Sequence, residues 1–429
     1  RRGQPLAEPR EYWKLSFQRD AQGLGEGAEL EEAIVGELRA AVKRRLVAEV
    51  PLGAFLSGGV DSSAIVALMA GLDDKPVNTC SIAFGDADYD ESQFARMVAE
   101  RYATQHRVEQ VDPEDFALVE RLPGVYDEPY ADSSAIPTYR VCELARQQVT
   151  VALSGDGGDE NYAGYRRHRW HAWEEAIRGR VPNALRKPLF GTAGAVYPKM
   201  DWAPRFLRAK STLQALARDS LEGYLNSVSI LPVELRRRLL SGDVRNTLQG
   251  YEAIEVFRRH AATAHGCDPL SLVQYLDIKT YLPGDILTKV DRASMAHGLE
   301  VRVPMLDHEF VAWSARLPSS LKLRGREGKY VLKKALEPLL PDDVLYRPKM
   351  GFAVPLGRWF RGPLREQMRE AVTGSVLREL GLFDTKMLTT LVDEHERGQR
   401  DHTAVLWALL MFRGAVTNLS QPVVSSRAA

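Results

Sequence analysis

Leu56-Ser57-Gly58-Gly59-Val60-Asp61-Ser62-Ser63 is the stretch that decides the fold. It follows an apolar segment, 50–55, and precedes another, 64–70, which predicts a glycine-rich turn between a strand and a helix. Backbone N–H groups and the helix dipole converge at such a turn and form an anion site. Asp61 would repel a phosphate unless Mg²⁺ lay between them. The stretch therefore predicts a magnesium–phosphate site, with an ordinary turn as the alternative. It is not a P-loop, because the Gly-Lys-Ser/Thr ending is missing.

Composition excludes several classes of protein. The chain has 429 residues, enough for two or three domains, with 57 basic and 57 acidic side chains. This balance gives no global charge to attract nucleic acid or an anionic membrane. No apolar run reaches the ~20 residues of a membrane helix, and 406–412 is expected to be a buried helix. Cys80, Cys142 and Cys267 lack metal-ligand spacing and indicate free thiols in a reducing, cytoplasmic setting.

Strand and helix patterns alternate in the first part of the chain. Further strands are predicted at 77–84, 107–111 and 149–153, and helices at 30–46, 91–102 and 137–146. This order is typical of a doubly wound parallel α/β sheet, whose ligands bind beyond the carboxyl ends of the strands. After about residue 165 the pattern is helical, and no clear strand is predicted. The basic and aromatic residues of 166–178 could indicate a nucleic-acid patch, but the acidic residues among them favour a solvated helix face.

A second glycine turn, Ser154-Gly155-Asp156-Gly157-Gly158-Asp159-Glu160, follows the strand predicted at 149–153. Alone it could be a plain turn or a calcium-like loop, although it lacks the ligand spacing of an EF-hand. At the end of a strand in the same sheet it would face the first loop. Asp61 and Asp159 would then supply the one or two carboxylates that a phosphate-bridging Mg²⁺ ion needs.

With these two motifs and two later ones, the chain resembles the synthetase domain of the glutamine-dependent asparagine synthetase family. The later motifs are 290–307, which includes Gly298-Leu299-Glu300-Val301-Arg302-Val303-Pro304, and Gly328-Lys329-Tyr330-Val331-Leu332-Lys333-Lys334. The resemblance implies a nucleotide-binding core of the ATP pyrophosphatase type followed by a mostly helical region. The domains expected are a linker from a preceding domain, 1–28; the nucleotide-binding core, 29–165; a helical insertion, 166–270; a helical remainder, 271–418; and a tail, 419–429.

The resemblance also implies a chemistry. A substrate carboxylate attacks the α-phosphorus of ATP, pyrophosphate leaves, and ammonia converts the acyl-adenylate into an amide and AMP. The cofactors implied are ATP and Mg²⁺, with Asp61 and Asp159 as the metal ligands. The pyrophosphate loop would comprise Ser57, Gly58, Gly59, Asp61 and Ser62. Leu56, Ile82 and Gly155 lie where the family holds adenosine, and Lys329 matches a lysine that stabilises the departing pyrophosphate.

Asp156 and Asp285 are candidates for the amide-forming step. In the family an acidic residue or a tyrosine follows Ser-Gly near the attacking amine, and an acidic partner upstream often supports it. Such a pair could accept a proton from ammonia. For Asp285 a helix-start carboxylate is an equal alternative. A metal or triad site in 297–308 is not favoured, because no metal-ligand spacing fits.

The chain departs from the family pattern in two places. Residue 1 is Arg and every cysteine is internal, so the N-terminal cysteine nucleophile of the glutaminase domain is missing, and that domain is expected as a partner in a longer protein. Segment 127–137 also lacks the arginine that well-known aspartate-using members carry before its proline.

The function expected is amidation of aspartate to asparagine, with ammonia as co-substrate. The alternative is amidation or cyclisation of another carboxylate, such as a sugar acid, a peptide or a β-lactam precursor. A tRNA-modifying pyrophosphatase and a nucleotide-binding protein without catalysis are less favoured. Neither nucleic acid nor a membrane is an expected partner, and a homodimer stays open.

Overall fold

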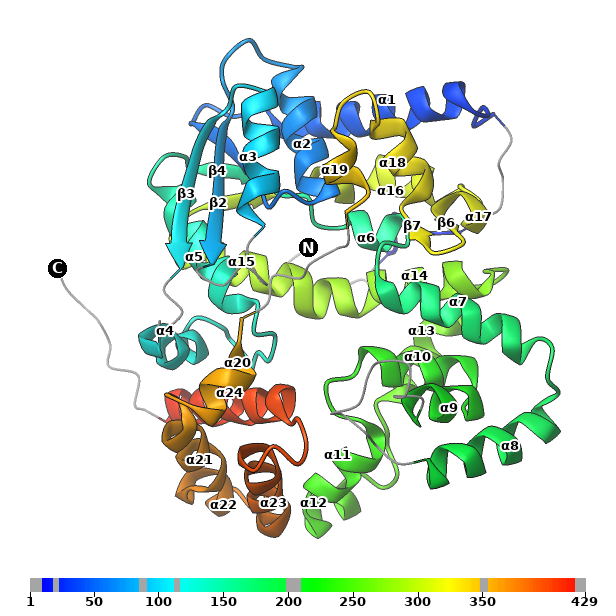
Figure 1. Ribbon diagram of the computed structural model, residues 1–429, viewed down its shortest axis with the longest axis vertical. Helices are drawn as coiled ribbons and strands as arrows, with labels where there is room; N and C mark the ends of the chain where they lie inside the picture. The colour runs from blue at the N-terminus through cyan, green and yellow to red at the C-terminus, as the bar shows by residue number, and fades with distance from the viewer. Residues whose placement is uncertain are drawn as a thin grey trace, which may run out of the picture.

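A computed structural model describes residues 10–17, 23–84, 91–111, 116–197, 210–347 and 354–420. One parallel sheet and many helices make up the molecule, with the sheet at the upper left of Figure 1 and helical layers beside and below it. The strands of the main sheet are β1 (Leu52–Phe55), β2 (Asn78–Phe84), β3 (Gln105–Val111), β4 (Val151–Leu153) and β5 (Glu300–Arg302).

The sheet order is β3-β2-β1-β4-β5, and every neighbouring pair is parallel. The chain moves outward from β1 to β2 and β3, then returns to place β4 on the other side of β1. The strand order therefore reverses between β1 and β4, where Ala54 pairs with Leu153. Ligands of doubly wound sheets bind at such a reversal. The predicted fold class is confirmed.

Helices cover both faces of the sheet. Those of the first half are α1 (Ala28–Arg45), α2 (Val60–Ala70), α3 (Ser92–Arg101), α4 (Phe116–Arg121), η1 (Leu122–Gly124), α5 (Ala135–Arg146), α6 (Gly158–Asn161), α7 (Arg166–Arg178), α8 (Asn183–Val196), α9 (Lys210–Ala217), α10 (Ser220–Val228), α11 (Val233–Leu239), α12 (Gly242–Thr247) and α13 (Ile254–Ala261). The helices that follow are α14 (Pro269–Lys279), η3 (Leu282–Leu287), α15 (Thr288–Met295), η4 (Pro304–Leu306), α16 (His308–Ala315), α17 (Ser319–Lys322), α18 (Tyr330–Leu336), α19 (Asp342–Leu345), α20 (Leu356–Arg361), α21 (Arg365–Thr373), α22 (Ser375–Glu379), α23 (Thr385–Glu396) and α24 (Thr403–Ser420).

Alternating strand residues explain the two layers of helices. Ala54, Val151 and Leu153 pack into a core shared with α1, α2 and α18. Cys80 and Ala152 point the other way, into a core shared with α5, α15 and α20 to α24. Successive side chains of a strand face opposite sides, so short strands of apolar residues require helices on both sides.

Two features after residue 165 were not predicted from the sequence. The first is β5, which pairs Glu300 with Val151 and Arg302 with Leu153, so the expectation of no strand in this region was wrong. The second is a hairpin of β6 (Leu323–Arg324) and β7 (Glu327–Gly328). These strands are very short, and β5 lies at the edge of the sheet and carries two charged residues, which hides the apolar pattern of a strand.

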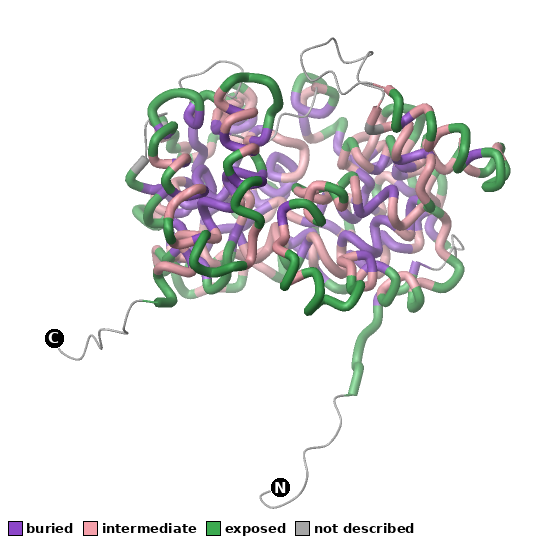
Figure 2. The backbone as a smooth tube through the Cα atoms, turned by 90° about the horizontal axis from the view of Figure 1, so that it is seen from below, coloured by how far each residue is buried: buried purple, intermediate pink, exposed green. Residues whose placement is uncertain are grey.

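Buried segments run through the interior, and exposed ones lie at the periphery (Figure 2). By length and composition α24 could cross a membrane. Its apolar residues instead pack inside the protein, with Trp407 1% exposed, which confirms the expected buried helix. In the expected linker, Leu15 and Phe17 are buried beside Tyr275. The domain boundaries remain predictions.

Candidate active site

Two loops meet where the strand order reverses. The first, 56–59, joins β1 to α2, and the second, 154–157, joins β4 to α6. They are so close that a Cβ atom on Gly155 would lie 2.6 Å from the backbone nitrogen of Ser62. Gly155 is therefore required for contact between the loops. The structure brings together the two motifs that the sequence predicted to face each other.

The first loop has a fixed internal structure. The hydroxyl groups of Ser57 and Ser62 are 3.0 Å apart, and the Ser57 N–H donates to the Ser62 hydroxyl over 3.2 Å. Gly58 has φ +70°, and a Cβ atom there would lie 2.6 Å from the Ala95 nitrogen. A side chain at this position would be strained and would collide with α3. The loop thus holds its shape at the N-terminus of α2, as an anion site requires.

Asp61, Asp159 and Lys329 form a buried cluster across the two loops. The Lys329 ammonium is hydrogen-bonded to Asp61 and lies 2.8 Å from Asp159 Oδ1. Asp61 stands in the first turn of α2 and Asp159 in α6. Residues widely separated in the sequence therefore converge on one point. Burial lowers the pKa of Lys329, but Asp159 and Asp61 outweigh it and raise that pKa above its ordinary value, so the lysine is charged.

The β6–β7 hairpin positions Lys329 beside Asp61 and Asp159. Lys329 follows β7 directly and has φ 57°, a left-handed conformation that is uncommon for residues other than glycine. Its N–H donates to the Tyr162 carbonyl over 2.9 Å. Gly164 leaves room for the cluster, because a Cβ atom there would lie 2.0 Å from Asp159 Oδ1 and 2.2 Å from Lys329 Cε. Strained backbone positions of this kind cluster at functional sites.

The donor set fits a magnesium–phosphate group. Mg²⁺ prefers oxygen ligands and is usually held by one or two carboxylates together with substrate phosphates. Asp61 and Asp159 already share one cation, the Lys329 ammonium, so their oxygens face a common point. Both lie beside a preformed anion loop. The residues present therefore match what the sequence predicted for ATP and Mg²⁺, while the ligand roles remain predictions.

The residues expected near adenosine lie at or near strand ends. Leu56 is fully buried just after β1, and its N–H donates to the Cys80 carbonyl over 2.9 Å. Ile82 lies in β2 with its side chain in the core, and Gly155 lies in the second loop. Since these side chains are buried or absent, contact with a nucleotide would involve the backbone. This role stays a prediction.

Arg347 is a candidate site residue that the sequence interpretation missed. Its guanidinium donates to the Gly58 carbonyl over 3.0 and 3.2 Å and to Glu91 over 2.6 Å. It also lies 4.4 Å from the centre of the Phe94 ring. A second cation, with its side chain 9% exposed, thus stands at the predicted phosphate loop. No spacing or periodicity in the sequence indicates this contact, because 289 positions separate Arg347 from Gly58.

Asp285 lies in the π-helical turn η3, a rare helix type that often marks functional sites. The Tyr130 hydroxyl donates to Asp285 Oδ1 over 2.5 Å. Burial, together with the nearby Asp132 carboxylate, raises the pKa of Asp285 above its usual range. A raised carboxyl pKa suits proton transfer near neutral pH. Asp285 also lies in the first turn of η3, so the helix-start alternative describes its position as well, and its role in proton transfer stays a prediction.

A buried lysine, Lys289 in α15, is influenced by Asp285 and by Asp156 of the second loop. Its ammonium donates to Asp132 over 3.0 Å and to the Ser134 hydroxyl over 2.7 Å. Burial lowers the pKa of Lys289, but Asp132, Asp156 and Asp285 outweigh it and raise that pKa. Asp156 accepts a hydrogen bond from Ser154 over 2.6 Å. The two acids expected to act together therefore both influence the same buried cation, which the sequence interpretation did not identify.

Segment 297–308 makes structural contacts, and its role as a scaffold stays a prediction. Asp307 is bound by Arg44 over 2.6 and 3.0 Å and by Arg45 over 2.6 Å, and it caps α16. The His297 ring packs 4.3 Å from the Tyr139 ring. Within the described ranges no group of three metal-ligating side chains is found.

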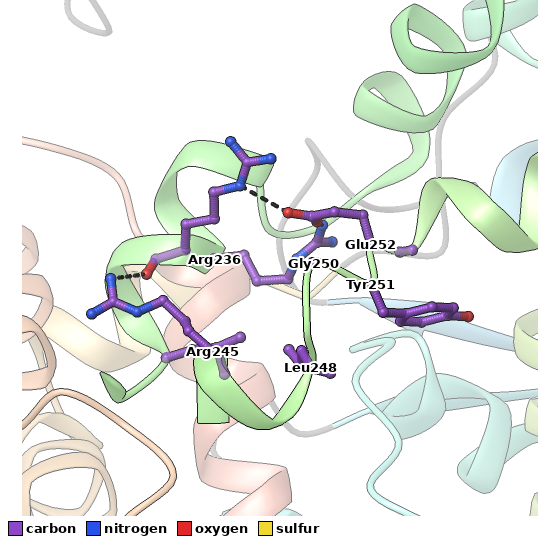
Figure 3. A pocket seen from close by; sticks show the side chains of 9 residues that line it. Arg236, Arg245, Leu248, Gly250, Tyr251 and Glu252 are labelled. Atoms are coloured by element: carbon purple, nitrogen blue, oxygen red, sulfur yellow. Dashed lines mark hydrogen bonds and ion pairs between the residues drawn. The ribbon is translucent and has the colours of Figure 1, made fainter. Parts of the chain in front are cut away.

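An open pocket of about 480 Å³ lies elsewhere, between α11, α12 and the start of α13 (Figure 3). Arg236 and Arg237 line it, and both pair with Glu252. It contains none of the predicted site residues. We assign it no part in the chemistry.

Comparison with known proteins decides the family. The model of the asparagine synthase family matches residues 33–417. The chain belongs to the asparagine synthase family. It is 34% identical over 387 residues to a putative asparagine synthetase (glutamine-hydrolyzing) of Mycobacterium tuberculosis strain H37Rv, covering 89% of this chain and 56% of the relative. It is 30% identical over 389 residues to asparagine synthetase (glutamine-hydrolyzing) 1 of Bacillus subtilis strain 168, covering 89% and 59%.

More distant relatives carry other names. The amidase chry2 of Gibberella zeae is 26% identical over 428 residues, covering 90% of this chain and 61% of the relative. The chain spans 56% to 61% of the length of the relatives described here. Membership of the asparagine synthase family confirms the resemblance and supports an ATP-dependent ligase, but it does not identify the carboxylate substrate.

Proposed function

We propose that this protein is an ATP-dependent ligase that adenylates a carboxylate and then converts the acyl-adenylate to an amide with ammonia. Aspartate is the proposed substrate and asparagine the product. The observation that carries the proposal is the Lys329 ammonium shared by Asp61 and Asp159 between two glycine loops, in a chain of the asparagine synthase family.

The nucleotide-binding part of the site follows from the charges. Asp61 and Asp159 would hold Mg²⁺, which neutralises charge on the phosphates when bound. The loop 57–59 and the N-terminus of α2 would bind pyrophosphate oxygens through N–H and hydroxyl groups. Lys329 would stabilise the charge that grows as pyrophosphate leaves, because a fixed cation acts most strongly on developing charge in a site that excludes water.

The amide-forming part uses the second cluster. Ammonia attacks the acyl carbon of the adenylate, AMP leaves with the electron pair of the broken C–O bond, and the nitrogen loses a proton. Asp285, whose pKa is raised by burial and by Asp132, is the proposed acceptor of that proton, with Asp156 beside the attacking amine. Tyr130 orients the Asp285 carboxyl through its hydrogen bond.

The substrate and the ammonia source are separate parts of the proposal. Segment 127–137 has no arginine to bind a second carboxylate of aspartate, so a guanidinium fork is not available there. The fungal relatives named as amidases support the alternative of another carboxylate. Relatives named glutamine-hydrolyzing support delivery of ammonia by a glutaminase domain. A homodimer and a cytoplasmic location remain predictions.

The test is a pyrophosphate-release screen with ATP, Mg²⁺ and ammonium. Aspartate is compared with glutamate, uronic acids and carboxylated peptides, and amide formation is followed by mass spectrometry. Release with aspartate, together with asparagine and AMP, supports the full proposal. If a sugar acid or a peptide is used instead, aspartate is rejected as the substrate and the ligase proposal stands. Absence of carboxylate-dependent release with every compound rejects the ligase proposal.

A further inference from the structure

The buried Lys289 ammonium is the centre of a charge cluster next to the proposed nucleotide site. Lys289 is 8% exposed, and its ammonium donates hydrogen bonds of 3.0 Å to Asp132 and 2.7 Å to the Ser134 hydroxyl. The Lys289 carbonyl accepts a hydrogen bond from the Tyr126 hydroxyl over 3.4 Å. Tyr126 thus contacts the Lys289 backbone, while Asp132 and Ser134 fix the ammonium in place.

The groups around this ammonium come from several elements. Asp132 precedes α5, Asp156 lies in the loop after β4, and Asp285 lies in η3; each carboxylate raises the pKa of Lys289. The tyrosines of the cluster are Tyr126 and Tyr130, whose rings stack 4.3 Å apart, and Tyr281, which hydrogen-bonds Asp285. The Arg167 guanidinium lies 4.3 Å from the centre of the Tyr281 ring.

Three carboxylates near one ammonium repel one another strongly when little water is present. A single ion pair with Asp132 would be enough to hold the start of α5. Asp285 lies four positions before Lys289 in the continuous η3–α15 helix, and both it and Asp156 act electrostatically on the ammonium, which the ion pair with Asp132 does not explain. Without the Lys289 cation, burial and the Asp132 charge would favour the protonated form of Asp285 still more, and a protonated acid cannot accept a proton from an amine.

We propose that Lys289 is a positioning residue for amide formation, which holds Asp132 and Ser134 in place and keeps the Asp285 carboxylate available to receive the proton of the attacking amine. This inference rests on the proposed ligase function and extends it. It assigns Lys289 to the second half-reaction, whereas Lys329 serves the first.

The test compares the two half-reactions in Lys289→Met. We expect carboxylate-dependent pyrophosphate release in the first turnover and the KM for ATP to be unchanged, and kcat for the amide to fall about 10²-fold, the usual size of a general-base contribution. Lys289 lowers the pKa of Asp285. Its removal raises that pKa further, so the acid limb of the kcat–pH profile moves to higher pH.

Two further variants support the comparison. Lys289→Arg keeps the positive charge and should recover part of kcat and return the acid limb toward its original position. Lys322→Met makes the same substitution at another buried lysine outside the cluster, 1% exposed, and should not move the acid limb. If Lys289→Met does not fold by circular dichroism, Ser134→Ala removes one hydrogen bond to the ammonium and should move the limb in the same direction by less.

The outcomes separate the two proposals. An unchanged kcat–pH profile in Lys289→Met, or in Ser134→Ala where that variant replaces it, overturns the inference while the ligase function stands. An equal loss of first-turnover pyrophosphate release and amide formation also overturns it, because the lysine would then act on adenylation. A wild-type protein without carboxylate-dependent pyrophosphate release overturns the ligase function and this inference with it.

Discussion

Replacing Lys329 by alanine should slow the chemistry far more than it weakens ATP binding. The ammonium lies 2.8 Å from Asp159, which corresponds to an attraction of about 6 kcal/mol at an effective dielectric constant of ~20. The cost of burying the charges offsets part of this, so removing one partner of such a pair costs about 3–5 kcal/mol of stability. Loss of a fixed charge aimed at a transition state typically lowers kcat by about 10²–10³-fold.

The assay measures kcat and KM for ATP through pyrophosphate release, and thermal unfolding with and without Mg²⁺. In Lys329→Ala the carboxylates of Asp61 and Asp159 have lost their shared cation, so Mg²⁺ should raise the Tm of this variant more than that of the wild type. The control is Lys334→Ala on the same helix, where a half-exposed lysine pairs with Glu337 over 2.6 Å. We expect both its kcat and its response to Mg²⁺ to match the wild type.

A change confined to KM would refute the reasoning, because a cation that acts on the transition state must appear in kcat. An equal Mg²⁺ response in Lys329→Ala and wild type would contradict the placement of the metal between Asp61 and Asp159.

Other expectations concern the same loops and the scaffold. Asp61→Asn and Asp159→Asn should each lower pyrophosphate release by about 10²-fold or more, with an unchanged circular dichroism spectrum; full activity in either would contradict the assigned metal ligands. Arg347→Ala should raise the KM for ATP about tenfold, as loss of a charged hydrogen bond to the loop would do, and an unaltered KM would exclude this role. Burial opposes ionisation of Asp307, but hydrogen bonds from Arg44 and its neighbours lower the Asp307 pKa to about 2. Its stabilising contribution is therefore complete above the unfolded pKa near 4 and is lost as pH falls through about 2; acid titration of Asp307→Asn should lack this part of the stability loss.

Much of the sheet could be predicted because its strands carry their own signal. Apolar runs before glycine turns identified β1 and β4, and alternation with amphipathic helices implied parallel pairing. The strand β5 was missed because Glu300 and Arg302 flank a single apolar residue at the sheet edge, and only its pairing with β4 defines it as a strand. The local pattern of apolar residues does not indicate that a segment pairs with a strand so far away in the sequence.

The residues of the candidate site were likewise only partly predictable from the sequence. Asp61 and Asp159 were predicted to converge because both follow strands of one sheet, and their cluster with Lys329 agrees with that expectation. Arg347 and Lys289 were missed. Each is an ordinary basic residue in sequence, and only tertiary contacts place it beside the loops.

The pairing of β5 with β4 has a consequence for synthesis of the chain. Val151 hydrogen-bonds in register with Glu300, and the ammonium of Lys329 emerges later still. At ribosomal rates of roughly 5–20 residues per second, the first four strands wait about 7–30 s for the fifth strand. During that interval β4 is an open edge at which another nascent chain could pair. We expect ribosome-bound chains that end before β5 to need protection by chaperones. The shortest ribosome-bound chains that bind nucleotide should be those that extend past α18.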